Sequence, residues 1–219
     1  LASLAESAFD PLARSCRFML TEEAHHMYVG ETGVARVIQK ACNVMRENKT
    51  DDVRKYGAID LPTIQKYVNF HFSVSADLFG AEQSTNAANY FTQGLKGRYQ
   101  EAHISDDHQL KDEGYTVAGV SDGRLTKEEI PALTAINERL RDDYIADCAR
   151  GVGRWNKIIA DAGIDFHISL PHRGFHRQIG VFSEVSMTPA GEILDTEHWQ
   201  QRREEWLPSA EDEAYVESL

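Results

Sequence analysis

The sequence predicts a mainly helical fold with a small β-containing appendage at its C-terminal end. Apolar residues recur with helical spacing along several stretches between residues 34 and 159. Signals for helix starts precede several of these stretches, and a group of short strand-like runs follows Gly163. We therefore expect a helical portion over residues 1–163 and a small α+β appendage over residues 164–219.

The first third of the chain predicts two helical regions. The first begins at Asp10-Pro11, since an N-cap residue followed by Pro is a common helix start. It should run from residue 12 to 29, stop at Gly30 and Gly33, and resume over residues 34–46. Its apolar stripe consists of Val34, Val37, Ile38, Ala41 and Met45. After a polar loop at 48–57, Asp60-Leu61-Pro62 predicts the next helix.

The middle of the chain predicts two more helices separated by a hairpin. Residues 81–96 have a helical pattern, and residues 117–125, around Asp122-Gly123, are typical of a small hairpin. Thr126-Lys-Glu-Glu129 has the pattern of a capping box. A long helix is therefore expected from there, with a bend at Gly151 and Gly153.

The last part of the chain changes character. Residues 166–170, 178–182 and 184–187 predict short strands, followed by a turn at 188–191. An amphipathic helix is expected from Thr196 to Leu207, and a final helix begins at Pro208-Ser209.

The composition argues against several classes of function. The 219-residue chain has a formal net charge of -12, which repels nucleic acid and anionic membranes. No apolar run is long enough to span a bilayer, and the first residues lack the features of a signal peptide. The three cysteines, Cys16, Cys42 and Cys148, form no CxxC pattern and fit buried thiols in a reducing compartment. We expect a cytoplasmic protein without nucleic-acid or membrane partners.

A carboxylate–imidazole pair is the strongest sign of chemistry. Glu23 precedes His26 by three residues in the first predicted helix, so both side chains lie on one helical face and can bind one metal ion. Two such pairs with two further carboxylates form a di-iron site in a four-helix bundle. Glu22 and His25 form a second register, which we interpret as outer groups that hold the ligands in place. A solvated polar face is the alternative.

Stretches spread over nearly the whole chain carry a family resemblance. They are Phe18-Met-Leu-Thr-Glu-Glu-Ala-His-His-Met27 and residues 28–34, 58–62, 77–80, 86–89, 141–148, 154–157 and 170–175. These stretches resemble the oxygenase components of benzoyl-CoA 2,3-epoxidases, within the wider class of ferritin-like di-iron monooxygenases. In that class Asp-Glu-x-x-His supplies a Glu and a His to iron. Glu22 stands at the Asp position, Glu23 and His26 match the ligands, and His25 stands where the class often has Arg.

The resemblance implies a partial ferritin-like helical bundle and a definite chemistry. It implies two iron ions, O₂ as co-substrate, benzoyl-CoA as the substrate to be epoxidised, and a separate NADPH-dependent reductase. No nicotinamide or flavin motif occurs in the chain, so electrons must come from another protein.

The chain departs from the family pattern in its number of ligands. The family is considerably longer, and its other ligands come from helices before this motif. A second Glu-x-x-His does not occur, and we interpret Asp195-x-x-His198 as a helix cap. The chain is therefore expected to be a C-terminal portion with one of two half-sites, incompetent alone. The alternative is a non-catalytic helical subunit or an acyl-CoA-binding fragment.

Two polar clusters are candidates for binding the acyl-CoA. Lys157, Arg173 and Arg177 concentrate positive charge in an acidic chain, and Arg can bind phosphate through two parallel hydrogen bonds. The alternative is that they balance neighbouring acids. Asn86 and Asn89 repeat at helical spacing and could bind the amides of a pantetheine arm, although such a face more often packs against another polar surface.

Overall fold

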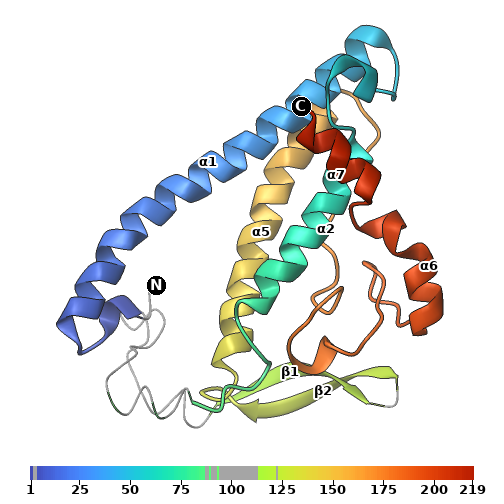
Figure 1. Cartoon of the computed structure of the whole chain (residues 1–219). Helices are drawn as coiled ribbons and strands as arrows, with labels where there is room; N and C mark the ends of the chain where they lie inside the picture. The colour runs from blue at the N-terminus through green and yellow to red at the C-terminus, as the bar shows by residue number, and fades with distance from the viewer. Residues whose placement is uncertain (2–3, 87–88, 90–92, 94–112, 122) are drawn as a thin grey trace.

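The computed structural model describes residues 1, 4–86, 89, 93, 113–121 and 123–219 of the chain (Figure 1). The elements are η1 (Leu4–Glu6), α1 (Asp10–Asn48), η2 (Arg54–Tyr56), α2 (Leu61–Asp77), β1 (Gly114–Ser121), β2 (Arg124–Pro131), α5 (Ile136–Asp161), η4 (Gly180–Phe182), α6 (Thr196–Trp206) and α7 (Ala210–Glu217). The prediction of a mainly helical fold with a small β part is confirmed. Among the described helices, none combines the length and the apolar character needed to cross a bilayer.

Helix α1 is a single unbroken helix, so the predicted interruption at Gly30 and Gly33 is wrong. A glycine inside a helix costs only about 1 kcal/mol relative to alanine, which the hydrogen bonds of the surrounding turns offset. The helix begins at Asp10, with Phe9 as its N-cap residue. It ends where Lys49 adopts a left-handed conformation and donates its backbone N–H to the carbonyl of Met45.

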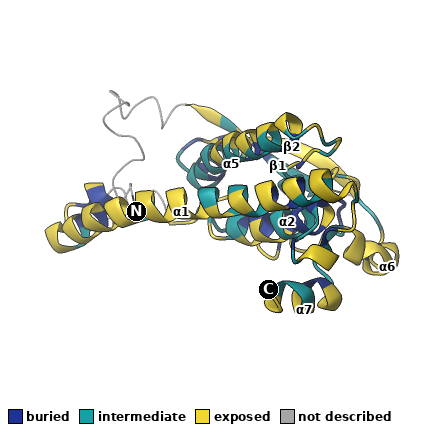
Figure 2. Cartoon of the chain, turned by 90° about the horizontal axis from the view of Figure 1, so that it is seen from above, coloured by how far each residue is buried: buried dark blue, intermediate teal, exposed yellow. Residues whose placement is uncertain are grey.

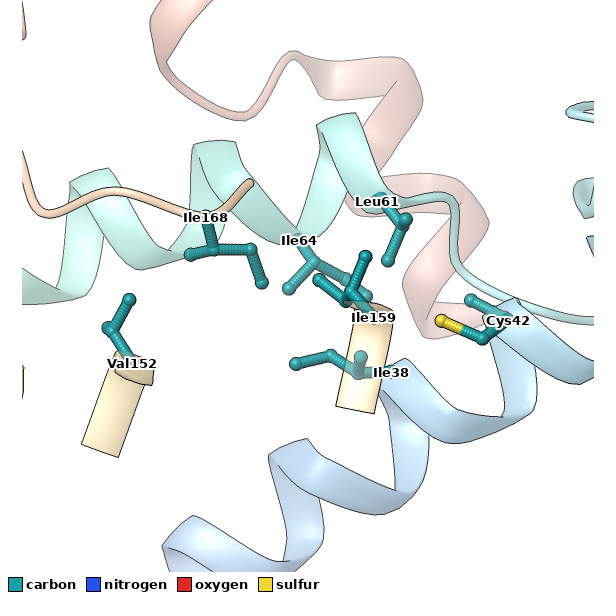
Figure 3. Close-up of a cluster of buried hydrophobic side chains, with 8 residues drawn as sticks. Ile38, Cys42, Leu61, Ile64, Val152, Ile159 and Ile168 are labelled. Carbon is teal, nitrogen blue, oxygen red and sulfur yellow. The ribbon is translucent and has the colours of Figure 1, made fainter. Parts of the chain in front are cut away.

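The main core lies where α1, α2 and α5 meet (Figure 3). The C-terminal half of α1 contributes Ile38 and Cys42, and the predicted stripe of this helix is confirmed. The side chains that complete this core come from α2, α5 and the segment after α5: Leu61, Ile64, Val152, Ile159 and Ile168. Burying each large aliphatic side chain contributes about 1.5–3 kcal/mol, so this cluster anchors the three helices to one another.

The predicted hairpin is confirmed, and its strands are longer than expected. β1 and β2 pair antiparallel from Gly114↔Pro131 to Ser121↔Arg124. Gly123 in the turn has a φ of 69°, a left-handed conformation that favours glycine. The prediction of a capping box at residues 126–129 is wrong, because these residues belong to β2 and pair with β1. Helix α5 begins nine residues later than that pattern indicated, with Ala135 instead of Thr126 as the N-cap residue, and Ala135 makes no side-chain hydrogen bond.

The strands expected between residues 166 and 187 do not form. Residues 164–170 have no regular structure, residues 180–182 form η4, and an isolated bridge joins Met187 to Ile193. Side-chain amides replace the missing strand partners. Asn156 of α5 receives the N–H of Ile168 and donates to its carbonyl, both at 2.8 Å, and Gln65 of α2 binds Ser169 in the same way.

The last two helices begin at the predicted caps. The side chain of Asp195 accepts the backbone N–H of His198, which confirms the interpretation of this pair as a cap. Ser209 forms a capping box with Asp212 at the start of α7. Asp212 also receives Lys66 of α2 at 2.9 Å and the guanidinium of Arg54, while the hydroxyl of Tyr215 donates to the carbonyls of Arg54 and Ala58. We call Arg54, Lys66, Asp212 and Tyr215 the C-terminal clasp, since they hold α7 against α2.

Candidate functional site

Glu23 and His26 lie one helical turn apart on the N-terminal half of α1. The Nδ1 atom of His26 is 3.6 Å from the Oε1 atom of Glu23, and their side chains are 63% and 46% exposed respectively. Two atoms bound to one metal ion at about 2.1 Å each can be up to about 4.2 Å apart. The pair can therefore contact a single ion without a change of helix geometry, and it faces solvent in this chain.

The neighbours of this pair are also exposed. The side chains of Glu22 and His25 lie in solvent, and the His25 ring is 6.5 Å from the His26 ring, centroid to centroid. Within the described part of the chain, no side-chain hydrogen bond joins Glu22 or His25 to either predicted ligand. The same residues include no group of three or more His, Cys, Asp or Glu side chains arranged to hold a metal ion. Within the described residues, the two predicted ligands are thus a pair of donors without a third, and we call this pair the half-site.

The half-site lies on a projecting segment that we call the arm, residues 10–30 of α1. Figures 1 and 2 show it extending away from α2 and α5, with most of its surface exposed. Its start contacts η1, and Ala13 and Cys16 are buried in this part of the helix. Between residues 17 and 30 it carries several exposed large apolar side chains: Phe18, Met19, Leu20, Met27, Tyr28 and Val29. The described residues supply no cover for this apolar surface.

We expect the chain to self-associate through the arm. Phe18 and Met27 are 71% and 66% exposed, and their separation of nine residues places them on opposite sides of the helix, so both sides leave apolar surface open to association. Replacing both with Ser should raise the dissociation constant at least tenfold, since burying each side chain in the contact stabilises it by about 1.5–3 kcal/mol. Sedimentation velocity over a concentration series measures this shift. Leu78→Ser, at an 85% exposed position beyond α2, is the matched control. A parent chain that stays monomeric at high concentration would contradict the prediction.

The arginines predicted to bind phosphate are engaged by carboxylates. The Arg177 side chain is 0% exposed and donates to Asp77, while Arg173 donates to Glu138 at 2.8 Å and to Asp142. These contacts favour the alternative in which both arginines balance acidic side chains and support the fold. Lys157 is exposed on α5 and does not share these contacts.

A second buried arginine completes this group, and sequence reasoning missed it. Arg141 is 0% exposed, pairs with Glu138, lies 3.7 Å from Glu82, and donates to the carbonyls of Ala76 and Gly80. Burial lowers the pKa of Arg141 to about 10 and that of Arg173 below its ordinary value. We call the set the ion-pair network: Asp77, Glu82, Glu138, Arg141, Asp142, Arg173 and Arg177. Its members come from three separated parts of the chain, so no local pattern reveals it.

The amide face predicted to bind pantetheine is only partly described. Asn86 and Asn89 are exposed, and the N–H of Gln93 donates to the carbonyl of Asn89 at 3.0 Å, as in a helix. The described residues 81–86 form bends instead of the predicted helix, and most of residues 87–96 lie outside the described residues. Substrate binding by Asn86 and Asn89 stays a prediction.

Comparison with known proteins adds an independent line of evidence. No family model matches the chain. The chain is 56% identical over 222 residues to the benzoyl-CoA oxygenase component B of Aromatoleum evansii. The match covers 100% of this chain and 47% of that protein, so the chain spans about half the length of this relative.

Proposed function

We propose that this chain is part of the oxygenase component of an enzyme that epoxidises the aromatic ring of benzoyl-CoA. The observation that carries the proposal is the 56% identity, along the whole chain, to a protein named as a benzoyl-CoA oxygenase component. Identity at this level over 222 residues is far more specific than any single motif. By the same proposal, the chain is one part of a ferritin-like bundle in a cytoplasmic enzyme.

Glu23 and His26 would hold iron in this enzyme. Carboxylate oxygen and imidazole nitrogen are donors that suit iron, and one helix presents both to the same side. When bound, a pair of iron ions supplies the activation of O₂ with electrons from a separate NADPH-dependent reductase. Two donors cannot hold two ions, so further carboxylates and a second histidine must come from outside the described residues.

The residues around the pair have roles in shaping its surroundings. Glu22 and His25, now exposed, would orient the ligands once the arm is covered. The apolar side chains of the arm would then exclude water from the oxidising centre, which needs a dry pocket. Exposed Lys157, Asn86 and Asn89 remain candidates for the polar parts of the acyl-CoA.

The alternative function is a helical subunit that binds no iron of its own. It is favoured by one observation, the two-donor character of the site within the described residues. Metal content separates the two functions: the oxygenase should contain two iron ions per complete site, and the alternative should contain none.

Iron occupancy of single variants tests the proposal. In the polypeptide as its gene encodes it, Glu23→Ala and His26→Ala are each expected to lower the affinity for iron more than about 100-fold, because each removes a direct ligand, whereas losses at supporting groups are typically about 10–100-fold. Glu22→Ala should have the smaller effect. Glu47→Ala, at an exposed position near the end of α1, is the control. Full iron occupancy in both ligand variants would overturn the assignment.

A further inference from the structure

Glu31, the residue that follows the arm, is hydrogen-bonded to α5. Its carboxylate receives two donors of the Arg154 guanidinium, with Nη2 at 2.6 Å from Oε2. Its backbone carbonyl receives the indole N–H of Trp155 at 3.2 Å. Two consecutive residues of α5 therefore bind Glu31 of α1. Arg154 binds the Glu31 side chain, and Trp155 binds the Glu31 backbone carbonyl.

This contact occurs where the packing of α1 ends. On the C-terminal side, Val34 and Val37 already pack against the main core. On the N-terminal side, within the described part of the chain, no hydrogen bond or ion pair joins residues 17–30 to another element. Glu31 is thus the last fixed point of α1 before the arm projects.

The helix is locally weak at this position. Gly30 and Gly33 flank Glu31, and no atom lies within 4 Å of the place that a Cβ would occupy at either glycine. No close packing therefore requires glycine there, and each glycine reduces helix stability by about 1 kcal/mol relative to alanine. An external contact between the two glycines is well placed to control the direction of the arm.

We infer that Glu31, Arg154 and Trp155 form a positioning bracket that sets the direction in which the arm carries Glu23 and His26. This inference rests on the proposed function for its purpose, and on the contacts above for its geometry. Two stretches singled out in the sequence, residues 28–34 and 154–157, thereby receive a joint role.

A small change of angle at the bracket produces a large displacement of the ligands, because they lie far along the arm. Glu23 lies eight residues before Glu31, which is about 12 Å along a helix. A tilt of about 10° at Glu31 would therefore move Glu23 by roughly 2 Å. Metal–ligand distances tolerate deviations of only about 0.2 Å, so a loosened bracket would misplace the ligands even though it contacts neither.

The bracket adds little to the stability of the fold, and its role is to fix the orientation of the arm. The Arg154 and Glu31 side chains are 57% and 37% exposed, so solvent screens their attraction. A two-point contact between guanidinium and carboxylate restricts orientation more than a single bond does. The hydrogen bond from Arg154 also lowers the pKa of the Glu31 carboxyl, so the pair persists into more acidic solution than an ordinary carboxyl would allow.

The test measures arm direction and iron separately, in the polypeptide as its gene encodes it. Spin labels on Arg17→Cys and Ala160→Cys, both at exposed positions, report the arm-to-core distance by pulsed electron paramagnetic resonance. Every sample carries Cys148→Ala, while Cys16 and Cys42 are buried. Arg154→Glu and Glu31→Arg should each broaden the distance distribution at least twofold. The double variant Glu31→Arg/Arg154→Glu should restore a narrow distribution, because the two charges meet again.

A matched control lies one turn away on the same helix. Arg150 pairs with Asp147 within α5 and does not reach α1, so Arg150→Glu should leave the distribution unchanged. Iron-dependent turnover should fall about tenfold in the single bracket variants, as for other outer residues of metal sites, and recover in the double variant. Narrow distributions in both single variants, or no recovery in the double variant, would overturn the bracket. Failure of the proposed function would give a different result: iron content would not change in Glu23→Ala and His26→Ala, while the arm-to-core distances would still change in the bracket variants.

Discussion

Glu138→Gln is expected to lower the free energy of unfolding by about 3–5 kcal/mol, the usual result of removing one partner from a buried ion pair. The Glu138 side chain is 1% exposed and receives both Arg141 and Arg173. Without its charge, the buried guanidinium of Arg141 loses its nearest anion and keeps only the more distant Glu82 at 3.7 Å. The loss of charge costs more than the change of shape, because glutamine is nearly the same size. Urea unfolding followed by circular dichroism measures the change.

Helix α5 also contains an exposed ion pair with the same i, i+3 spacing as Glu138 and Arg141, which serves as a control for Glu138→Gln. Asp147 and Arg150 also pair at i and i+3, but their side chains are 52% and 65% exposed. Asp147→Asn should change the free energy of unfolding by no more than about 0.5 kcal/mol, as is usual for surface substitutions. Equal small losses at Glu138 and Asp147 would show that the ion-pair network does not stabilise the fold, and would reopen phosphate binding by Arg173 and Arg177.

Asp212→Asn is expected to lower the free energy of unfolding by about 3 kcal/mol near neutral pH, through loss of a nearly buried charge partner. The Asp212 side chain is 5% exposed, and Lys66, Arg54 and Ser209 hold the pKa of its carboxyl well below its usual range despite the opposing effect of burial. A group with a depressed folded-state pKa stabilises the fold above its unfolded pKa of about 3.9, and this stability is lost as the pH falls through the folded pKa.

The lowered pKa of Asp212 makes the stabilisation by the C-terminal clasp depend on pH. Below about pH 4 the parent chain should lose stability more steeply than Asp212→Asn, which has no carboxyl to protonate. Unfolding at pH 7, 5 and 3 measures both effects. Glu213→Gln, at the next and exposed residue of α7, should follow the parent within about 0.5 kcal/mol. Parallel stability curves for the parent chain and Asp212→Asn would contradict the assigned role of the clasp.

Features that depend on local interactions could be predicted from the sequence. The caps at Asp60, Asp195 and Ser209 work within one helical turn, and each was found at the expected helix start. The apolar stripe of α1 and the hairpin turn at Gly123 are likewise set by periodicity and backbone conformation over a few residues. The relation of Glu23 to His26 is of this kind, because i and i+3 share a helix face wherever the helix lies.

Features that depend on distant partners required the tertiary structure. Thr126 to Glu129 has the composition of a capping box, yet pairing with β1 makes it a strand. Residues 166–170 have the composition of a strand, yet the amides of Gln65 and Asn156 supply their hydrogen bonds and no strand forms. In both places a long-range partner outweighs a local preference of about 1 kcal/mol or less.

The sequence by itself determined the fold class, most helix starts and the two metal-type donors on one helical face. The tertiary structure alone decided that Arg173 and Arg177 face buried acids, that the donors lie on an exposed arm, and that Glu31 fixes this arm to α5. The physical reason is the same in each case. Hydrogen bonds and side-chain spacing within a turn are encoded by neighbouring residues, whereas burial and ion pairing depend on which distant segments the fold brings together.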